Sequence, residues 1–241
     1  MKRIQLLFLA LLALSSVVAQ QNADTNQLTK RPVELRAFGL YGYNYTWEHY
    51  GSLDLAARVP LSRYFELDAA AELSTVNVYS FSFNARPLFP VPVGDLFLDT
   101  RLLYKVVARN RMHDFVGSFS FGYRMDYVNV SVGLFSRIMA DFDRDWHSED
   151  EFLVEPFGVL YNLEVFVRPQ VSPWNLSFRI SNFDDYNQER VWQMLFMLGG
   201  SYSPTEHLTL LAQVQCKPTG MFHLNATFYG IQGRLGVAYR F

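Results

Sequence analysis

The sequence predicts an all-β fold, a transmembrane antiparallel up-and-down β-barrel of about twelve strands, with ten or fourteen as alternatives. Aromatic residues make up 16% of the 241 residues, yet the mean hydropathy is only +0.01, which alternating apolar and polar faces produce. After residue 19 no run of about 20 uncharged apolar residues occurs, so membrane-spanning helices are excluded. From Val33 onward the chain alternates with a period of two.

The N-terminal 19 residues are predicted to be a secretory signal peptide. Lys2 and Arg3 precede an apolar stretch from Ile4 to Leu14, and small residues lead to a cleavage site before Gln20. Residues 20–32 are polar and patternless, which indicates a short periplasmic lead-in to a barrel over 33–241. Removing two cations changes the net charge from −2 to −4, so nucleic acid is not an expected partner. The one cysteine cannot form an internal disulfide.

Each strand is predicted from period-two alternation between turn residues. In "GDLFLDTRLLYKVVAR", Leu96, Leu98 and Leu102 fall on one face, whereas Asp99 and Arg101 fall on the other. The same reading along the chain gives segments near 33–45, 51–60, 63–73, 76–89, 95–108, 114–126, 127–139, 153–168, 174–182, 191–202, 207–217 and 222–241.

The connections between these segments alternate in character. One set is short and turn-like: "PLS", "PVPVG", "MDYV", "PQVSP" and "SPTEH". The other set is more polar: "TWEHY", "RNRMH", "ADFDRDWHSEDE" and "NFDDYNQER". Short turns at one end and longer loops at the other are typical of an outer-membrane barrel with both termini in the periplasm.

Two soluble folds also show alternation. The strands of a β-sandwich average about five or six residues, whereas several segments here alternate for ten residues or more. A lipocalin-like barrel would place the apolar row inside, and alternation alone does not exclude it. Aromatic residues near strand ends, such as Tyr41, Tyr104 and Trp174, favour the membrane barrel because they match interfacial girdles.

The final segment supplies a resemblance. Leu235, Val237, Tyr239 and Phe241 alternate up to a terminal aromatic residue, which resembles the C-terminal β-signal of Gram-negative outer-membrane β-barrel proteins. The resemblance implies export through the periplasm, recognition by the barrel-assembly machinery, and residence among outer-membrane lipid and lipopolysaccharide. It identifies no functional subfamily and leaves the oligomeric state open.

Charged side chains on the polar faces are predicted to point into the lumen, with both signs in rough balance. A strongly ion-selective pore would show one sign at a constriction, so a salt-bridged closed interior and a narrow channel stay open as alternatives. The predicted lumen charges are Asp54, Arg58, Glu66, Asp68, Glu72, Arg86, Asp99, Arg101, Lys105, Arg124, Arg137, Glu164, Arg168, Arg179, Lys217 and Arg234.

The acidic loop 140–151 is a weak candidate for a cation site. Asp141, Asp143 and Asp145 are spaced like the start of a calcium-binding loop. Trp146 stands where such a loop needs Gly, and Phe152 stands where it needs Glu. A solvated loop is the simpler interpretation.

Catalysis is the third possibility. His147 with Ser148, or His113 with Asp114 and Ser118, would be the groups of an outer-membrane lipid hydrolase or acyltransferase, but neither spacing is distinctive. The sequence therefore predicts a porin-like or structural barrel without a cofactor. The alternative is a surface-binding or envelope-complex component that uses the acidic loop.

Overall fold

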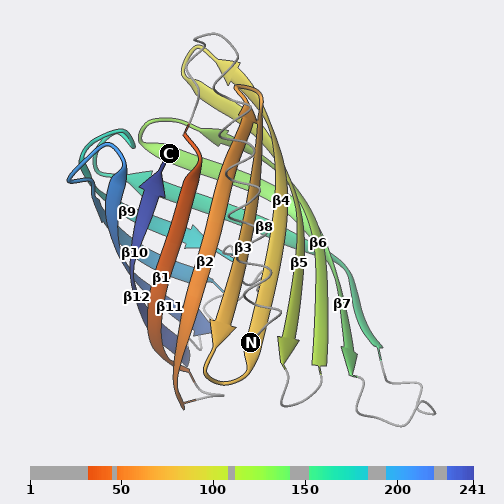
Figure 1. Cartoon of the computed structure of the whole chain (residues 1–241). Helices are drawn as coiled ribbons and strands as arrows, with labels where there is room; N and C mark the ends of the chain where they lie inside the picture. The colour runs from red at the N-terminus through yellow and green to blue at the C-terminus, as the bar shows by residue number, and fades with distance from the viewer. Residues whose placement is uncertain (1–31, 45–47, 108–111, 142–151, 184–193, 220–226) are drawn as a thin grey trace.

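The computed structural model is a closed barrel, and it describes residues 32–44, 48–107, 112–141, 152–183, 194–219 and 227–241 (Figure 1). Each strand pairs antiparallel with its neighbours in sequence, and β1 closes on β12. Among the described residues, no helix is long and apolar enough to cross a membrane. The strands are β1 (Glu34–Asn44), β2 (Glu48–Ser62), β3 (Phe65–Ser74), β4 (Val78–Val91), β5 (Gly94–Val107), β6 (Met112–Arg124), β7 (Val128–Asp141), β8 (Phe152–Phe166), β9 (Trp174–Ser181), β10 (Leu195–Tyr202), β11 (Leu208–Thr219) and β12 (Thr227–Arg240).

The predicted fold class and strand count are confirmed, and the alternatives of ten or fourteen strands are wrong. Every strand matches one predicted segment, with boundaries that differ by at most five residues, at the start of β12. The predicted signal peptide and nearly all of the lead-in lie outside the described residues.

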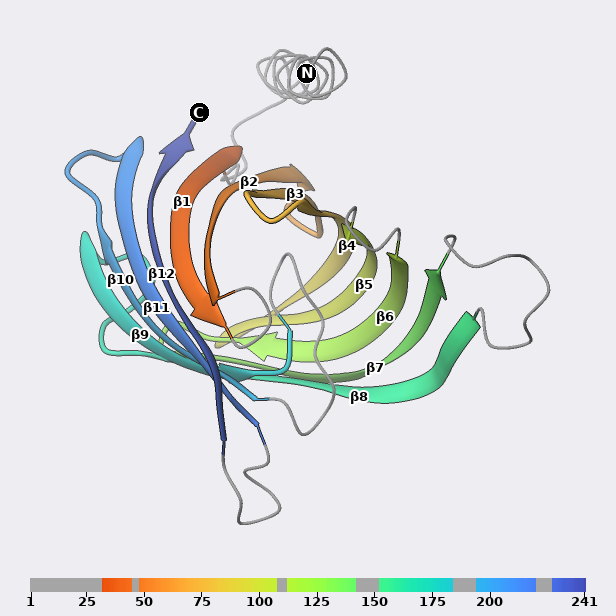
Figure 2. The same ribbon diagram turned by 90° about the horizontal axis from the view of Figure 1, so that it is seen from below.

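Closure depends on the pairing of β1 with β12. Eleven residue pairs join these strands, from Glu34 opposite Arg240 to Asn44 opposite Gly230. On its other side β1 pairs equally far with β2, from Glu34 opposite Arg58. The strands curve around a common interior, with β2 and β3 facing β7 and β8 across it (Figures 1 and 2). A closed sheet leaves no edge, so its backbone groups are bonded within the wall.

The outer face is apolar and the inner face is polar, which excludes the lipocalin-like arrangement. Asp54, Ser80 and Asn84 are at most 2% exposed because they point inward. An apolar exterior around a polar lumen is the arrangement of a barrel in contact with hydrocarbon. The outward-facing apolar residues include Phe83, Leu102, Phe119, Phe121, Val132, Leu134, Phe178, Leu198, Val214 and Leu235, each 45–72% exposed.

Short turns gather at one end of the barrel, as the sequence predicts. The turns after β2, β4, β6, β8 and β10 lie at the end where β1 begins and β12 finishes (Figure 1). The turn between β4 and β5 is tight because Gly94 has φ 101°, a conformation that other residues rarely adopt. At the opposite end only the β3–β4 connection is fully described.

A charge on the outer face tests the lipid contact. Leu134 is 53% exposed midway along β7, so Leu134→Arg should lower the free energy of unfolding from lipid vesicles by about 2–4 kcal/mol. Val171, 90% exposed in the turn after β8, is the control site. Urea titrations followed by tryptophan fluorescence should show little change for Val171→Arg, and equal losses for both variants would contradict a lipid-covered belt.

Candidate functional site

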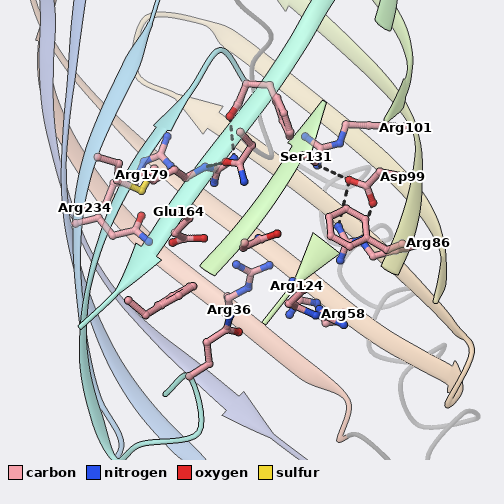
Figure 3. Close-up of a pocket in the computed structure, with 18 of the residues that line it drawn as sticks. Arg36, Arg58, Arg86, Asp99, Arg101, Arg124, Ser131, Glu164, Arg179 and Arg234 are labelled. Atoms are coloured by element: carbon pink, nitrogen blue, oxygen red, sulfur yellow. Dashed lines mark hydrogen bonds and ion pairs between the residues drawn. The ribbon is translucent and has the colours of Figure 1, made fainter. Parts of the chain in front are cut away.

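The lumen contains a cavity of about 260 Å³, here called the central cavity, that is surrounded by arginine side chains (Figure 3). Its charged lining consists of seven arginines and two acids, which come from eight different strands. Figure 3 shows Arg179, Arg234 and Glu164 on one side of this cavity, and Arg58, Arg86 and Asp99 on the other. The charged lining residues are Arg36, Arg58, Arg86, Asp99, Arg101, Arg124, Glu164, Arg179 and Arg234.

Arg86 on β4 connects three acids in the wall of the central cavity. Its Nε donates to Asp99 Oδ1 at 2.6 Å, and its Nη1 lies 2.9 Å from Asp68 Oδ2 and 3.4 Å from Glu66 Oε2. All four side chains are at most 16% exposed. Charges buried to this extent are costly unless they are paired, and Arg86 is the common partner of these three carboxylates in one part of the wall.

Three further arginines also pair with acids of the wall. Arg58 lies 3.0 Å from Asp68, Arg124 lies 3.5 Å from both Glu66 and Asp95, and Arg234 lies 3.4 Å from Asp54. Asp54 is fully buried and the Glu66 side chain is 2% exposed, and neither lines the central cavity. Several acids are therefore set back in the wall, while the guanidinium groups border the cavity.

Arg179 differs from these because its hydrogen bonds go to neutral groups. Its Nε donates to Asn162 Oδ1 at 2.5 Å, and its Nη2 donates to the Phe183 carbonyl at 2.9 Å. Within the described part of the chain, Arg179 makes no ion pair, although Glu164 lies opposite it in the strand register. The charge of Arg179 is thus less compensated than that of Arg86.

Aromatic rings on the inner face lie flat against the wall where a neighbouring strand has glycine. Phe97 on β5 is opposite Gly122 on β6, and Phe38 on β1 is opposite Gly236 on β12. A Cβ at either glycine would overlap the opposite ring. Phe135 and Gly158 form the same arrangement between β7 and β8. The missing side chains therefore give the rings room to lie along the wall.

A second cavity, the mouth cavity, has a volume of about 590 Å³ at the turn end of the lumen. It shares Arg36, Phe38, Gln170 and Gln213 with the central cavity, so the two adjoin. Its other lining groups are mainly hydroxyls and charges near the strand ends, including Glu34 and Arg240, whose side chains are 2.8 Å apart. A polar route thus leads from this mouth to the arginines.

The predicted lumen charges fall into three groups. Arg58, Arg86, Asp99, Arg101, Arg124, Glu164, Arg179 and Arg234 line the central cavity, whereas Asp54, Glu66, Asp68, Glu72 and Lys217 line neither cavity. Lys105 on β5 and Arg137 on β7 line neither cavity, and Arg137 is bound to Asp114 at 2.5 Å. Arg168 lies in the turn after β8, where its guanidinium sits 3.6 Å from the centre of the Trp174 ring. β8 ends at Phe166, so the alternation along this strand does not predict the direction of the Arg168 side chain.

The sequence analysis missed Arg36, Phe97 and Phe183 as cavity residues. Arg36 shares the polar face of β1 with Glu34, and that spacing could have identified it. Phe183 follows the end of β9, where no periodic pattern applies.

The weaker candidate sites are not assembled in the described part of the chain. Asp141 is the last residue of β7, whereas Asp143, Asp145, His147 and Ser148 lie outside the described residues. Among the residues that are described, no group of three or more His, Cys, Asp or Glu side chains could hold a metal ion. His113 Nδ1 is bonded to Tyr104 Oη at 2.6 Å, while Asp114 is bonded to Arg137. The two neighbours therefore belong to different contacts.

The residues of the terminal motif lie on the outer face of β12. Leu235 is 72% exposed, and Val237, Tyr239 and Phe241 are 44–57% exposed. The Tyr239 ring contacts Phe241 edge-on at 4.9 Å and stacks on His207 at 6.1 Å. Nothing in these contacts bears on recognition during assembly, which stays a prediction.

Comparison with other proteins gives the fold and no family. No protein-family model and no curated protein matches the sequence. Among solved structures, the chain is similar to the KdgM porin in complex with disordered oligogalacturonate, at 9% identity over 86% of this chain and 99% of that chain, with a TM-score of 0.53. The NanC porin is similar at 11% identity, over 86% of this chain and 100% of that one, with a TM-score of 0.53.

A third similar structure is the translocator domain of the autotransporter NalP from Neisseria meningitidis. It has 14% identity, covers 95% of this chain and 97% of that chain, and has a TM-score of 0.54. The chain therefore has the fold of outer-membrane β-barrel proteins. Porins and a translocator domain share this fold, so function has to be argued from the lumen.

Removing the Arg86 guanidinium tests the charge network. Arg86→Met leaves Glu66, Asp68 and Asp99 without their common partner, and should lower the free energy of unfolding by about 3–5 kcal/mol. Arg63, exposed in the β2–β3 turn over the Tyr64 ring, is the matched control, and its change to Met should cost about 0.5 kcal/mol or less. Urea unfolding measures both. Similar values for the two variants would show that the network contributes nothing to stability.

Proposed function

We propose that this chain is an outer-membrane, porin-like barrel whose narrow lumen passes small anionic solutes. The observation that carries the proposal is the lining of the central cavity, where seven arginines face two acids. Pores that select by charge do so with side chains of one sign near the narrowest part. Arginines outnumber the acids along this cavity, which favours anions over cations.

The arrangement of the ion pairs supports a positive potential at the cavity. The carboxylates of Asp54 and Glu66 are at most 2% exposed, so their charges are held in the wall behind their arginine partners. Arg179 adds a charge whose hydrogen-bond acceptors are neutral. A passing anion would thus meet guanidinium groups first, and each provides several donors in a planar fork that fits carboxylate and phosphate.

The dimensions support a restricted passage rather than a wide channel. A central cavity of about 260 Å³ accommodates small solutes, and the larger mouth cavity beside it opens among hydroxyl groups. Barrels of about eight strands are filled by their own side chains and those of sixteen or more leave a channel, so a narrow route between salt-bridged walls fits a barrel of twelve strands.

The outer surface supports the proposed location. The apolar belt would be covered by membrane lipid, with lipopolysaccharide as a further neighbour, and the barrel-assembly machinery would act on β12 during insertion. A transport role is favoured over lipid chemistry because His113 and Asp114 make separate contacts, with Tyr104 and Arg137 respectively.

Ion selectivity in planar bilayers tests the proposal. The wild-type barrel should pass chloride in preference to potassium. Arg179→Gln should lower that permeability ratio about five- to tenfold, because a unit charge about 7 Å from an ion in water contributes about 0.6 kcal/mol, in favour of chloride and against potassium. Among described residues this change breaks no ion pair, so the fold should be retained.

Arg63→Gln is the control because Arg63 lies in the exposed β2–β3 turn, away from the cavity. It should leave the permeability ratio unchanged. A wild-type current that prefers potassium would overturn the anionic passage.

A further inference from the structure

An apolar cluster lies inside the otherwise polar lumen. Its members come from five consecutive parts of the wall, and each is at most 8% exposed. Lipid contact does not explain these residues, because the strand-borne members lie on the inner face beside polar neighbours. The cluster consists of Leu103 on β5, Val116 on β6, Phe135 on β7, Leu160 on β8, and Phe183 beyond the end of β9.

Phe183 differs from the other inward aromatic residues because no strand carries it. Phe38, Phe97 and Phe135 each lie against a glycine of the next strand and thus stay along the wall. Phe183 follows Ser181, the last residue of β9, and packs over neighbouring strands of the same wall. Its ring therefore adds a layer on top of the wall, within the lumen.

A set of hydrogen bonds fixes the backbone of Phe183. The hydroxyl of Ser181 donates to the Phe183 carbonyl at 2.8 Å and accepts from its N–H at 3.1 Å. Arg179 donates to the same carbonyl at 2.9 Å. Beside it, the Asn182 amide donates to the Val159 carbonyl at 2.7 Å and accepts from the Tyr161 N–H at 2.9 Å. The chain is thus tied to β8 where it leaves β9.

The ring of Phe183 lies near two arginines of the central cavity. The guanidinium of Arg101 is 5.0 Å from the ring centroid, and that of Arg179 is 5.5 Å away. Both distances are within the range of attraction between a cation and an aromatic face. The hydrogen bonds to its backbone and the contacts of its ring with Arg101 and Arg179 thus place Phe183 next to the charges that would attract an anion.

Strand direction shows on which side of the arginines the cluster lies. β5 and β9 both run away from the turn end of the barrel, where β1 begins. Leu103 comes two residues after Arg101 on β5, and Phe183 comes four residues after Arg179. The cluster therefore follows the arginines on the side away from the mouth cavity, and Phe183 itself lines the central cavity.

We propose that Phe183 sets the size limit of the passage, as an apolar constriction next to the arginine-lined cavity. The inference rests on the proposed transport function. An apolar constriction impedes hydrated ions because they lose water contacts without gaining polar partners, and hydrophobic constrictions in channels restrict flow in this way. The arginines would then determine which sign of charge a passing solute carries, and Phe183 would determine how wide the solute can be.

Truncating the ring tests the inference in planar bilayers. Phe183→Ala should raise the single-channel conductance by roughly twofold or more, and Phe183→Leu should give an intermediate value, because each removes part of the constriction. Phe178→Ala is the matched control, since Phe178 lies on β9 but faces outward at 45% exposure. It should conduct like the wild type. Circular dichroism would check that all variants keep their β-structure.

The outcomes separate this inference from the function on which it rests. A conducting wild type with an unchanged Phe183→Ala variant would overturn the role of Phe183 and leave the transport function in place. Current that appears only in Phe183→Ala would show that the ring closes the wild-type lumen, which would overturn both the proposed passage and the role of Phe183 as its size limit. No current from either folded protein would overturn both proposals.

Discussion

The rest of the structure depends on closing the hydrogen-bonded sheet within an apolar surrounding. In hydrocarbon an unpaired peptide group has no alternative partner, so every strand needs a neighbour on both sides. The eleven residue pairs between β1 and β12 supply the last of these neighbours. Once the sheet is closed, side chains have only two directions, toward lipid or toward the lumen. The alternation that covers the outside with Leu, Val and Phe therefore also sends the charged residues inward.

Charged side chains that are crowded on the inner face of the barrel have to form ion pairs. The arrangement of these pairs determines which charges border the cavity. Arg86 joins Glu66, Asp68 and Asp99, and Arg234 joins Asp54, so much of the charge cancels locally. The cancellation is not uniform in space, since several carboxylates lie back in the wall while the longer guanidinium side chains reach the cavity. A nearly balanced composition can therefore border its cavity mainly with one sign. Side-chain length and depth decide this, rather than the count of charges.

The sequence was sufficient for everything that depends on a period of two. The strands follow from alternation, and the short turns follow from their turn residues. The outward direction of Leu235, Val237 and Tyr239 was predicted only with the help of the aromatic residues near strand ends and the terminal motif. Features that depend on register between strands could not be predicted. The contact of Phe97 with Gly122 depends on the register between β5 and β6. The ion pairs of Arg86 with three acids depend on the register among β3, β4 and β5. Arg168 and Phe183 lie just past strand ends, where the period no longer constrains direction.

The pairing of inward phenylalanines with glycines has a consequence for how the bore of this barrel can change. The diameter available to a solute depends here on residues that contribute no lining atoms, because Gly122 and Gly236 allow the rings of Phe97 and Phe38 to recline. A methyl group at Gly122 would overlap the Phe97 ring and push it toward the lumen, whereas one at Gly236 would also meet the backbone carbonyl of Ala37. Substitutions at glycines in the wall can thus reduce the width of the lumen in steps, while the side chains that a solute contacts stay the same.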